Sequence, residues 1–166
     1  VFTPGANAYT ITGSTINFNG SGAQNIPAFN YNNLTSSNTG ARTLPNGGTV
    51  GIAGAFTPGT NAYTITGSTI DYNGSGAQTI AAFNYNNLTS SNTGARTLAN
   101  AGTIGIAAVF TPGTNAYTIT GSTIDFNGSG PQTIPAFNYN NLTSSNTGAR
   151  TLANSGSIGI AGVFTP

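Results

Sequence analysis

Residues 56–109 read FTPGTNAYTITGSTIDYNGSGAQTIAAFNYNNLTSSNTGARTLANAGTIGIAAV, and residues 110–163 repeat this 54-residue unit with only six substitutions. Residues 2–55 are a third, more divergent copy, and residues 164–166 begin the unit again. Close repetition at a fixed period is typical of proteins that build length or a recurring surface. A catalytic site, by contrast, is normally assembled once from unlike residues. The repeat therefore favours a structural or multivalent role.

A shorter period lies inside each unit. The pattern Ala-x-Thr-(Ile/Leu) occurs at Ala62, Ala77 and Ala95 and returns at Ala116, so its spacings are 15, 18 and 21. A second short apolar stretch follows each occurrence. The unit therefore resembles three related sub-units of similar length, each long enough for one coil of a β-solenoid.

The local signals are those of β-strands. Short stretches rich in Thr, Ile, Tyr and Phe alternate with Gly, Asn and Pro, which favour turns. Ile70 and Tyr72, like Ile104 and Ile106, are two residues apart, so each pair points to one face of a strand. No segment has the apolar periodicity of a helix.

We therefore predict an all-β protein, a parallel β-solenoid (β-helix) of about nine coils with three coils in each repeat and equivalent positions stacked. The repeats are residues 2–55, 56–109 and 110–163, and residues 164–166 start a further one. The alternative is a β-trefoil or β-prism, in which three repeats close into one globule. The solenoid is favoured because a trefoil does not need the internal 15/18/21 spacing. Since no capping sequence is recognisable at either end, we expect a fragment of a longer array.

Composition excludes several classes of function. Only five residues are charged, and the net charge is +1. No basic patch is available to bind nucleic acid, and no apolar run is long enough for a membrane span. Cys and His are absent, so the chain has neither disulfides nor imidazole ligands. A chain so rich in Asn, Thr, Ser and Gly fits an extracellular or cell-surface protein of bacteria.

The charged residues do not suggest an active site. Asp71 and Asp125 are equivalent residues of two successive repeats, and Asn17 replaces them in the first. In a solenoid these carboxylates would lie too far apart to act as a catalytic pair. We expect the charged side chains, including Arg96 and Arg150, to face solvent or bond to turns. The prediction is a protein that is not an enzyme and has no cofactor and no metal.

Two sets of polar and aromatic residues are candidates for contacts. An aromatic pair two residues apart recurs in every repeat and could pack in the core, mediate contacts between rods or stack on a glycan; the members are Phe29, Tyr31, Phe83, Tyr85, Phe137 and Tyr139. Equivalent asparagines could form hydrogen-bonded ladders along the rod, as in cross-β assemblies; these are Asn33, Asn87 and Asn141.

Thr64-x-Thr66 and its copies resemble the threonine arrays of ice-binding solenoids. Such arrays need the threonine pair on nearly every coil, whereas here it occurs only once in each repeat. Outward threonines on a strand explain the pair equally well, because Thr favours β-structure.

Several strings of the repeat resemble the β-strand repeats of very large bacterial surface and secreted proteins. They are GSTIDYNGSGAQTI (67–80), YNNLTSS (85–91), GARTLANAGTIGIA (94–107) and FTPG (56–59). The resemblance is to filamentous-haemagglutinin-like and adhesin-type arrays and covers the whole chain. It implies a parallel β-helix, export and a role in adhesion or in an extracellular fibre, and it supplies no catalytic residue.

The expected function is that of a shaft or stalk in a long extracellular bacterial fibre or adhesin. With so few charges, copies of the chain are expected to associate with one another. The expected partner is therefore the protein itself, in a fibre or lateral bundle, with host or prey surface glycans as a further partner. The alternative is a repeat module that binds glycan or ice.

Overall fold

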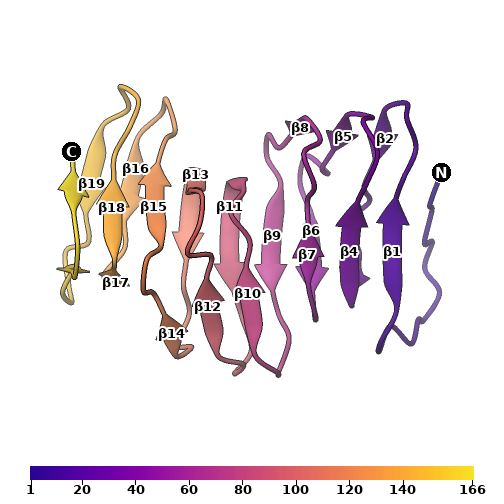
Figure 1. The fold of residues 1–166 in the computed structure, drawn as a ribbon, viewed down its shortest axis with the longest axis horizontal. Helices are drawn as coiled ribbons and strands as arrows, with labels where there is room; N and C mark the ends of the chain where they lie inside the picture. Colours follow the sequence, from indigo (N-terminus) through magenta and orange to yellow (C-terminus); the bar gives the residue numbers. More distant parts are fainter.

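The computed structural model describes residues 1–166 as an all-β protein with no helix, in which every strand pairing is parallel. The strands follow one another along a single long axis, with the two termini at opposite ends (Figure 1). The chain is a β-solenoid of about eight turns. The predicted fold class is confirmed, and the closed trefoil or prism is excluded.

The 21 strands are short, and most have two to four residues. They are β1 (Thr15–Phe18), β2 (Gln24–Asn25), β3 (Asn30–Tyr31), β4 (Asn33–Ser36), β5 (Arg42–Thr43), β6 (Thr49–Ile52), β7 (Phe56–Thr57), β8 (Tyr63–Thr64), β9 (Thr69–Tyr72), β10 (Gln78–Ile80), β11 (Asn84–Ser90), β12 (Arg96–Leu98), β13 (Ile104–Thr111), β14 (Tyr117–Thr118), β15 (Thr123–Phe126), β16 (Gln132–Ile134), β17 (Asn138–Tyr139), β18 (Asn141–Thr143), β19 (Arg150–Leu152), β20 (Gly159–Ile160) and β21 (Phe164–Thr165).

The solenoid has three walls. In the first part of the chain every strand pairs with the third strand after it, giving β1-β4-β7, β2-β5-β8 and the start of β3-β6-β9. The long strands β11 and β13 turn a corner, so each contributes to two walls, and the pairing of β11 with β13 has a bulge between Tyr85 and Asn87. Wall 1 contains β1, β4, β7, β10, β12, β14, β17 and β20. Wall 2 contains β2, β5, β8, the first halves of β11 and β13, β15, β18 and β21. Wall 3 contains β3, β6, β9, the second halves of β11 and β13, β16 and β19.

One 54-residue repeat contributes eight wall segments, since β11 counts twice. Eight is not a multiple of three, so each repeat ends one third of a turn short of three full coils. The prediction of nine coils, three in each repeat, is therefore slightly wrong, and the count is about eight. The sequence suggested that equivalent residues of successive repeats stack on one another. In the structure they do not stack, because they lie on different walls.

The internal 15/18/21 spacing has a structural explanation. Gln78 pairs with Arg96, and Arg96 pairs in turn with Tyr117, so the second and third steps of the spacing stay on wall 1. The first step, from Tyr63 to Gln78, joins no ladder, because β8 and β10 belong to different walls. Only two of the three spacings are therefore coil lengths.

The hydrogen-bonded ladders are interrupted once per repeat on two of the three walls. No ladder joins β7 to β10 on wall 1 or β8 to β11 on wall 2, although β6, β9 and β11 continue on wall 3. In the next repeat the interruptions lie between β13 and β16 on wall 3 and between β14 and β17 on wall 1, and wall 2 continues. Each repeat junction is therefore held by one unbroken ladder and two walls sealed by side chains.

Twenty-two buried apolar side chains form one continuous core. On wall 3, Ile70 pairs with Leu88, and Leu88 pairs with Phe110, so inward side chains stack from coil to coil. Burial depends on the neighbouring coil: Leu98 is 1% exposed, whereas the equivalent Leu152, in the last coil, is 59% exposed. Burying one such side chain stabilises the fold by about 1.5–3 kcal/mol, and here most of this gain comes from the next coil.

Candidate functional site

The core opens to the surface at one hollow in each repeat, which we call the aromatic notch. The three hollows are lined by equivalent residues and have volumes of about 270, 290 and 570 Å³ in chain order. They are formed by Asn7, Tyr9, Ile11, Phe29 and Asn30; by Asn61, Tyr63, Ile65, Phe83 and Asn84; and by Asn115, Tyr117, Ile119, Phe137 and Asn138, to which the third notch adds Ala136 and Ser157. Because successive repeats are rotated by a third of a turn, the notches open on three different walls.

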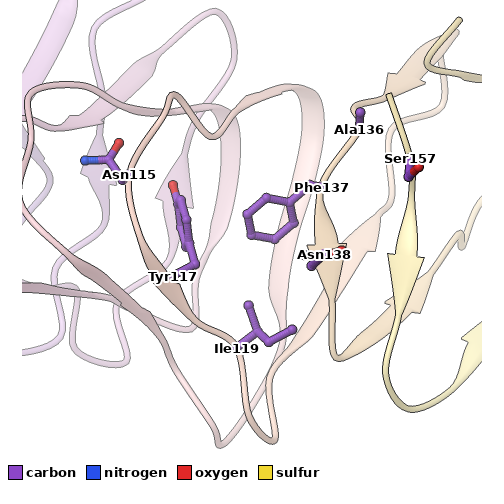
Figure 2. A pocket seen from close by; sticks show the side chains of 7 residues that line it. All are labelled: Asn115, Tyr117, Ile119, Ala136, Phe137, Asn138 and Ser157. Atoms are coloured by element: carbon purple, nitrogen blue, oxygen red, sulfur yellow. The ribbon is translucent and has the colours of Figure 1, made fainter. Parts of the chain in front are cut away.

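The notch forms where the ladder between β8 and β11 is interrupted. Side chains replace the missing backbone pairing, and the ring of Phe83 meets that of Tyr63 edge to face, with centroids 4.8 Å apart. The same ring also contacts Phe56 at 5.3 Å and Tyr85 at 5.0 Å. In the third notch, Tyr117 and Phe137 pack edge to face with centroids 4.8 Å apart, and Ile119 lies below them in the view of Figure 2. The floor is therefore aromatic and aliphatic and is only partly covered.

The rim of the notch is made of amides. Asn61 donates from Nδ2 to the carbonyls of Asn38 and Gly40, both at 2.8 Å, which fixes it on the preceding coil. Asn84 accepts at Oδ1 from Asn127 Nδ2 at 2.9 Å. The side chain of Asn84 is exposed, and its Nδ2 makes no hydrogen bond within the chain. No charged residue lines any of the three notches.

The arginine that recurs in each repeat has a structural role that the sequence indicated only as one of two possibilities. Arg96 is 0% exposed and donates to backbone carbonyls of two turns, with its shortest bonds to Gly94 at 2.7 Å, Ser91 at 2.7 Å and Tyr72 at 2.8 Å. Burial lowers the pKa of Arg96, although the phenol of Tyr117 and the carboxylate of Asp71 partly oppose this shift.

Arg42 is also 0% exposed, and Arg150 donates to the equivalent carbonyls from a partly exposed position; only Arg96 has a partner for its Nε, Ser90 Oγ at 2.9 Å. The expectation that the arginines bond to turns is confirmed. The alternative that they face solvent is wrong for Arg42 and Arg96. The sequence contains a signal for this role of the arginines. Each arginine follows Gly-Ala at the start of a short strand, directly after a turn.

The two carboxylates are not brought together. Asp71 lies on wall 3 and accepts from Ser91 N at 3.0 Å and Ser91 Oγ at 2.7 Å. Asp125 lies on wall 2 and bonds to Ser145 in the same way. No group of three or more acidic, His or Cys side chains gathers at a possible metal site. Each aspartate therefore fixes the turn of the next coil.

The predicted aromatic pairs are divided between the interior and the surface. Tyr31, Tyr85 and Tyr139 are at most 1% exposed and belong to the core, so their rings are not available for surface contacts. Phe29, Phe83 and Phe137 are partly buried and form the floor of the notches.

One core tyrosine has a polar partner that the other repeats lack. The hydroxyls of Tyr72 and Tyr85 lie 2.9 Å apart. Burial raises the pKa of Tyr72 to about 12 and that of Tyr85 well above its usual value. Phe18 and Phe126 occupy the position of Tyr72 in the first and third repeats.

The prediction of stacked asparagine ladders is wrong. Asn33, Asn87 and Asn141 lie on walls 1, 3 and 2, so they cannot stack on one another. Their amides instead bond to residues of the preceding coil: Asn33 to Thr15 Oγ1 at 3.3 Å, Asn87 to Ser68 O at 3.1 Å, and Asn141 to Thr123 Oγ1 at 3.3 Å. The prediction failed because it assumed that equivalent positions stack.

A different asparagine pair does bridge coils. Asn73 Nδ2 donates to Asn30 Oδ1 at 3.1 Å, across the strand that lies between them. The intervening strand contributes Gly51, and a side chain there would collide with the Asn30 amide. Asn84, Gly105 and Asn127 repeat this arrangement in the next unit.

Threonines form columns on the outer surface. On wall 1, Thr35 pairs with Thr57, and after the ladder interruption Thr79 pairs with Thr97 and Thr97 with Thr118. Wall 1 thus carries two runs of paired threonines, one of two coils and one of three, separated by the ladder interruption. The run of three consists of the threonines of the Ala-x-Thr-(Ile/Leu) pattern, whereas Thr35 and Thr57 lie outside that pattern.

Comparison with known protein families, with curated protein sequences and with solved structures finds no match. The structure contains no helix of the length and apolarity needed to cross a membrane.

Proposed function

We propose that the chain is a structural segment, a shaft or stalk, of a long extracellular fibre or adhesin made by a bacterium. The observation that supports this most directly is that each coil is stabilised by its neighbours along one axis. Leu44 and Leu98 are at most 2% exposed under the following coil, and at every repeat junction one ladder remains unbroken. Such a design adds length with each repeat and needs no other structure to fold against.

The mechanism of the shaft is mechanical. The strands run across the long axis (Figure 1), so the ladder hydrogen bonds between coils lie along the axis and oppose a pull on the ends. The arginines add to this resistance, because Arg96 bonds both to the turn that contains Gly74 and to the turn that contains Gly94. These turns belong to successive coils, so the guanidinium links them at a corner.

The proposed partner of the shaft is a second shaft. The walls present Thr, Ala and Asn, and the arginines are withdrawn into turns, so little charge repulsion keeps rods apart. Lateral association into a bundle is the expected form of self-contact. This surface is also compatible with the extracellular location proposed from composition.

The test of the shaft is growth in one dimension. Tandem genes encoding three, six and nine repeats would be measured by small-angle X-ray scattering. Eight turns at a strand spacing of about 4.8 Å add about 38 Å to the maximum dimension for every three repeats. Sublinear growth of the maximum dimension, as expected for compact globules, would contradict the proposal.

Force spectroscopy on the nine-repeat array tests the mechanical role. Each junction rests on one ladder, so repeats should unfold one at a time, and each event should release about 180 Å of chain. Extension at negligible force, without regularly spaced events, would argue against a shaft.

Ice binding is a second candidate function, favoured by the threonine runs on wall 1. Within the run Thr79, Thr97 and Thr118, the methyl and hydroxyl groups lie at a regular spacing of about 4.8 Å. Thermal hysteresis of the purified protein tests this candidate, and Thr97→Lys, which breaks this run at an exposed position, should abolish any effect. An effect that survives this substitution would assign it to another surface.

A further inference from the structure

We propose that each aromatic notch binds one neutral pyranose ring of a polysaccharide. This activity is separate from the shaft function, since it concerns openings in the walls rather than the walls themselves. The three notches are equivalent in sequence and occur at the same ladder interruption of each repeat. A hollow formed three times by the same five residue types is a property of the repeat.

The floor of the notch suits the apolar face of a sugar. Tyr63, Ile65 and Phe83 are packed against the core and remain partly exposed. The C–H groups on one side of a pyranose ring can pack on such a surface, and aromatic contacts of this kind contribute beyond the area they bury. The space of about 290 Å³ lies near the lower limit of small-molecule sites and accommodates about one ring.

The rim of the notch suits hydroxyl groups. Asn84 Nδ2 is exposed and lacks a partner within the chain, while its Oδ1 is held by Asn127. The amide is thus oriented before a ligand arrives, with a free donor beside the apolar floor. Asn30 and Asn138 occupy the same position in the other two notches.

The charge of the site selects a neutral ligand. No charged residue lines the notch, and Arg42, the cation that pairs with Tyr63 from the preceding coil, is 0% exposed and bonded to turn carbonyls. A phosphate or carboxylate would therefore find no compensating charge.

The rotation of the repeats determines how a polysaccharide can be engaged. Successive notches are separated by eight wall segments, or about 13 Å along the axis at the usual strand spacing, and open on walls a third of a turn apart. One straight polysaccharide chain along a wall therefore meets a notch only every three repeats. The rod is suited to bind several chains on different sides, and weak single sites would gain strength from their number.

The experiment is an NMR titration of the 166-residue protein with soluble neutral oligosaccharides, namely the hexamers of cellulose, chitin, mannan and amylose. We expect at least one of them to shift the amide signals of the notch residues, with a dissociation constant of about 1 mM. Absence of shifts for all four at about 10 mM would overturn the proposal. Tighter binding of an acidic oligosaccharide, such as a hexamer of alginate, would overturn the neutral ligand class.

Variants in all three repeats locate the site. Replacing Phe29, Phe83 and Phe137 together by Leu keeps the floor apolar but removes the rings, and should weaken binding about tenfold. The matched control replaces the outward threonines Thr43, Thr97 and Thr151 by Leu and should leave affinity unchanged.

A second variant avoids the core altogether. Replacing the exposed Asn30, Asn84 and Asn138 by Asp removes the free donor and should weaken binding severalfold while the circular dichroism spectrum is unchanged. Binding that is unaffected by both variants would place the saccharide elsewhere. None of these outcomes alters the scattering test, so the saccharide site and the shaft function are tested independently.

Discussion

The substitution Arg96→Met tests the role of the buried guanidinium. The new side chain has a similar length and fills the space with apolar atoms, but it donates no hydrogen bond. Six backbone carbonyls lie within hydrogen-bonding distance of the two terminal nitrogens, three of them at 2.7–2.8 Å, and Nε donates to Ser90 Oγ at 2.9 Å. All of these acceptors lose a charged donor at once.

The magnitude follows from the burial. A hydrogen bond to a charged group contributes about 1.5–3 kcal/mol, but these contributions are not additive, and transferring the guanidinium from water opposes them. The partners of Arg96 are all neutral, so the substitution leaves no buried charge behind, but each buried acceptor left unpaired costs about 1–3 kcal/mol. We therefore expect Arg96→Met to lower the free energy of local unfolding by about 3–5 kcal/mol, the cost of two or three such acceptors.

The repeat supplies a matched control. Arg150 donates to the equivalent carbonyls, including Gly148 at 2.6 Å and Phe126 at 2.7 Å, but it is partly exposed and its Nε lacks the serine partner of Arg96. Water can replace the guanidinium there, so Arg150→Met should cost about 1–2 kcal/mol. The lysine variant at residue 96 should recover less than half of the loss, because an ammonium group cannot reach both turns.

The assay is native-state hydrogen exchange of the amides in the two turns around residues 72–76 and 91–95, supported by urea unfolding. Exchange is needed because repeat proteins open locally as well as globally. If the two methionine variants lose the same stability, or if Arg96→Met loses less than about 1 kcal/mol, the guanidinium does not hold the turns together. The reasoning from burial would then be refuted.

Three further predictions concern the junctions and the core. Gln78 donates to two carbonyls of the preceding coil and accepts from the backbone of its own turn. Gln78→Leu should therefore lower the free energy of unfolding, measured with urea, by about 2–4 kcal/mol, because buried groups lose their partners. An unchanged stability would mean that these side-chain bonds do not replace the missing ladder on wall 1. Gly105→Ala would force the Asn84 amide aside and should lower the free energy of unfolding by about 1–3 kcal/mol. Gly130→Ala is the control and should be nearly neutral, because a methyl group there meets nothing within 4 Å. Equal effects of the two substitutions would exclude the steric explanation. Burial raises the pKa of Tyr72 to about 12 from about 10 in the unfolded chain, so its neutral form stabilises the fold below pH 10, and this contribution of about 3 kcal/mol is lost as the pH rises through 12. Tyr72→Phe should move alkaline unfolding, followed by circular dichroism, to higher pH, and an unchanged midpoint would contradict this reasoning.

The all-β class and the solenoid were predictable from particular residues. Ile70 and Tyr72 alternate with polar neighbours, and both are buried as expected. The steps from Gln78 to Arg96 and from Arg96 to Tyr117 are true coil lengths. Local alternation and coil length are properties of short stretches of chain, which is why a single sequence reveals them.

The number of walls could not be predicted, because the decisive corner has no turn residues. At Tyr85–Asn87 the chain passes from wall 2 to wall 3 inside one strand by a bulge, where the sequence offers neither Gly nor Pro. A missed corner changes the number of segments in a repeat, and that number decides which residues stack. The prediction of an asparagine ladder failed for this reason.

The aromatic notch was only half visible in the sequence. The pairs of Phe and Tyr were recognised as special, but their separation into Tyr85 in the core and Phe83 at the surface depends on the missing ladder beneath β11. Asn61 and Tyr63, which complete the notch, lie a full coil earlier in the chain. Only the coil length and the rotation together place them beside Phe83.

The rotation of one third of a turn also explains how nearly identical repeats can tolerate an imperfect ladder. Every repeat must interrupt two ladders, between its first and fourth segments and between its second and fifth. If a repeat had nine segments, these interruptions would recur on the same two walls, and the third wall alone would hold the rod along its whole length. With eight segments the continuous wall is wall 3 at one junction and wall 2 at the next. The openings are thereby distributed around the axis, so no side of the rod is weak throughout, and the same rotation that spreads the weakness also directs the notches to three sides.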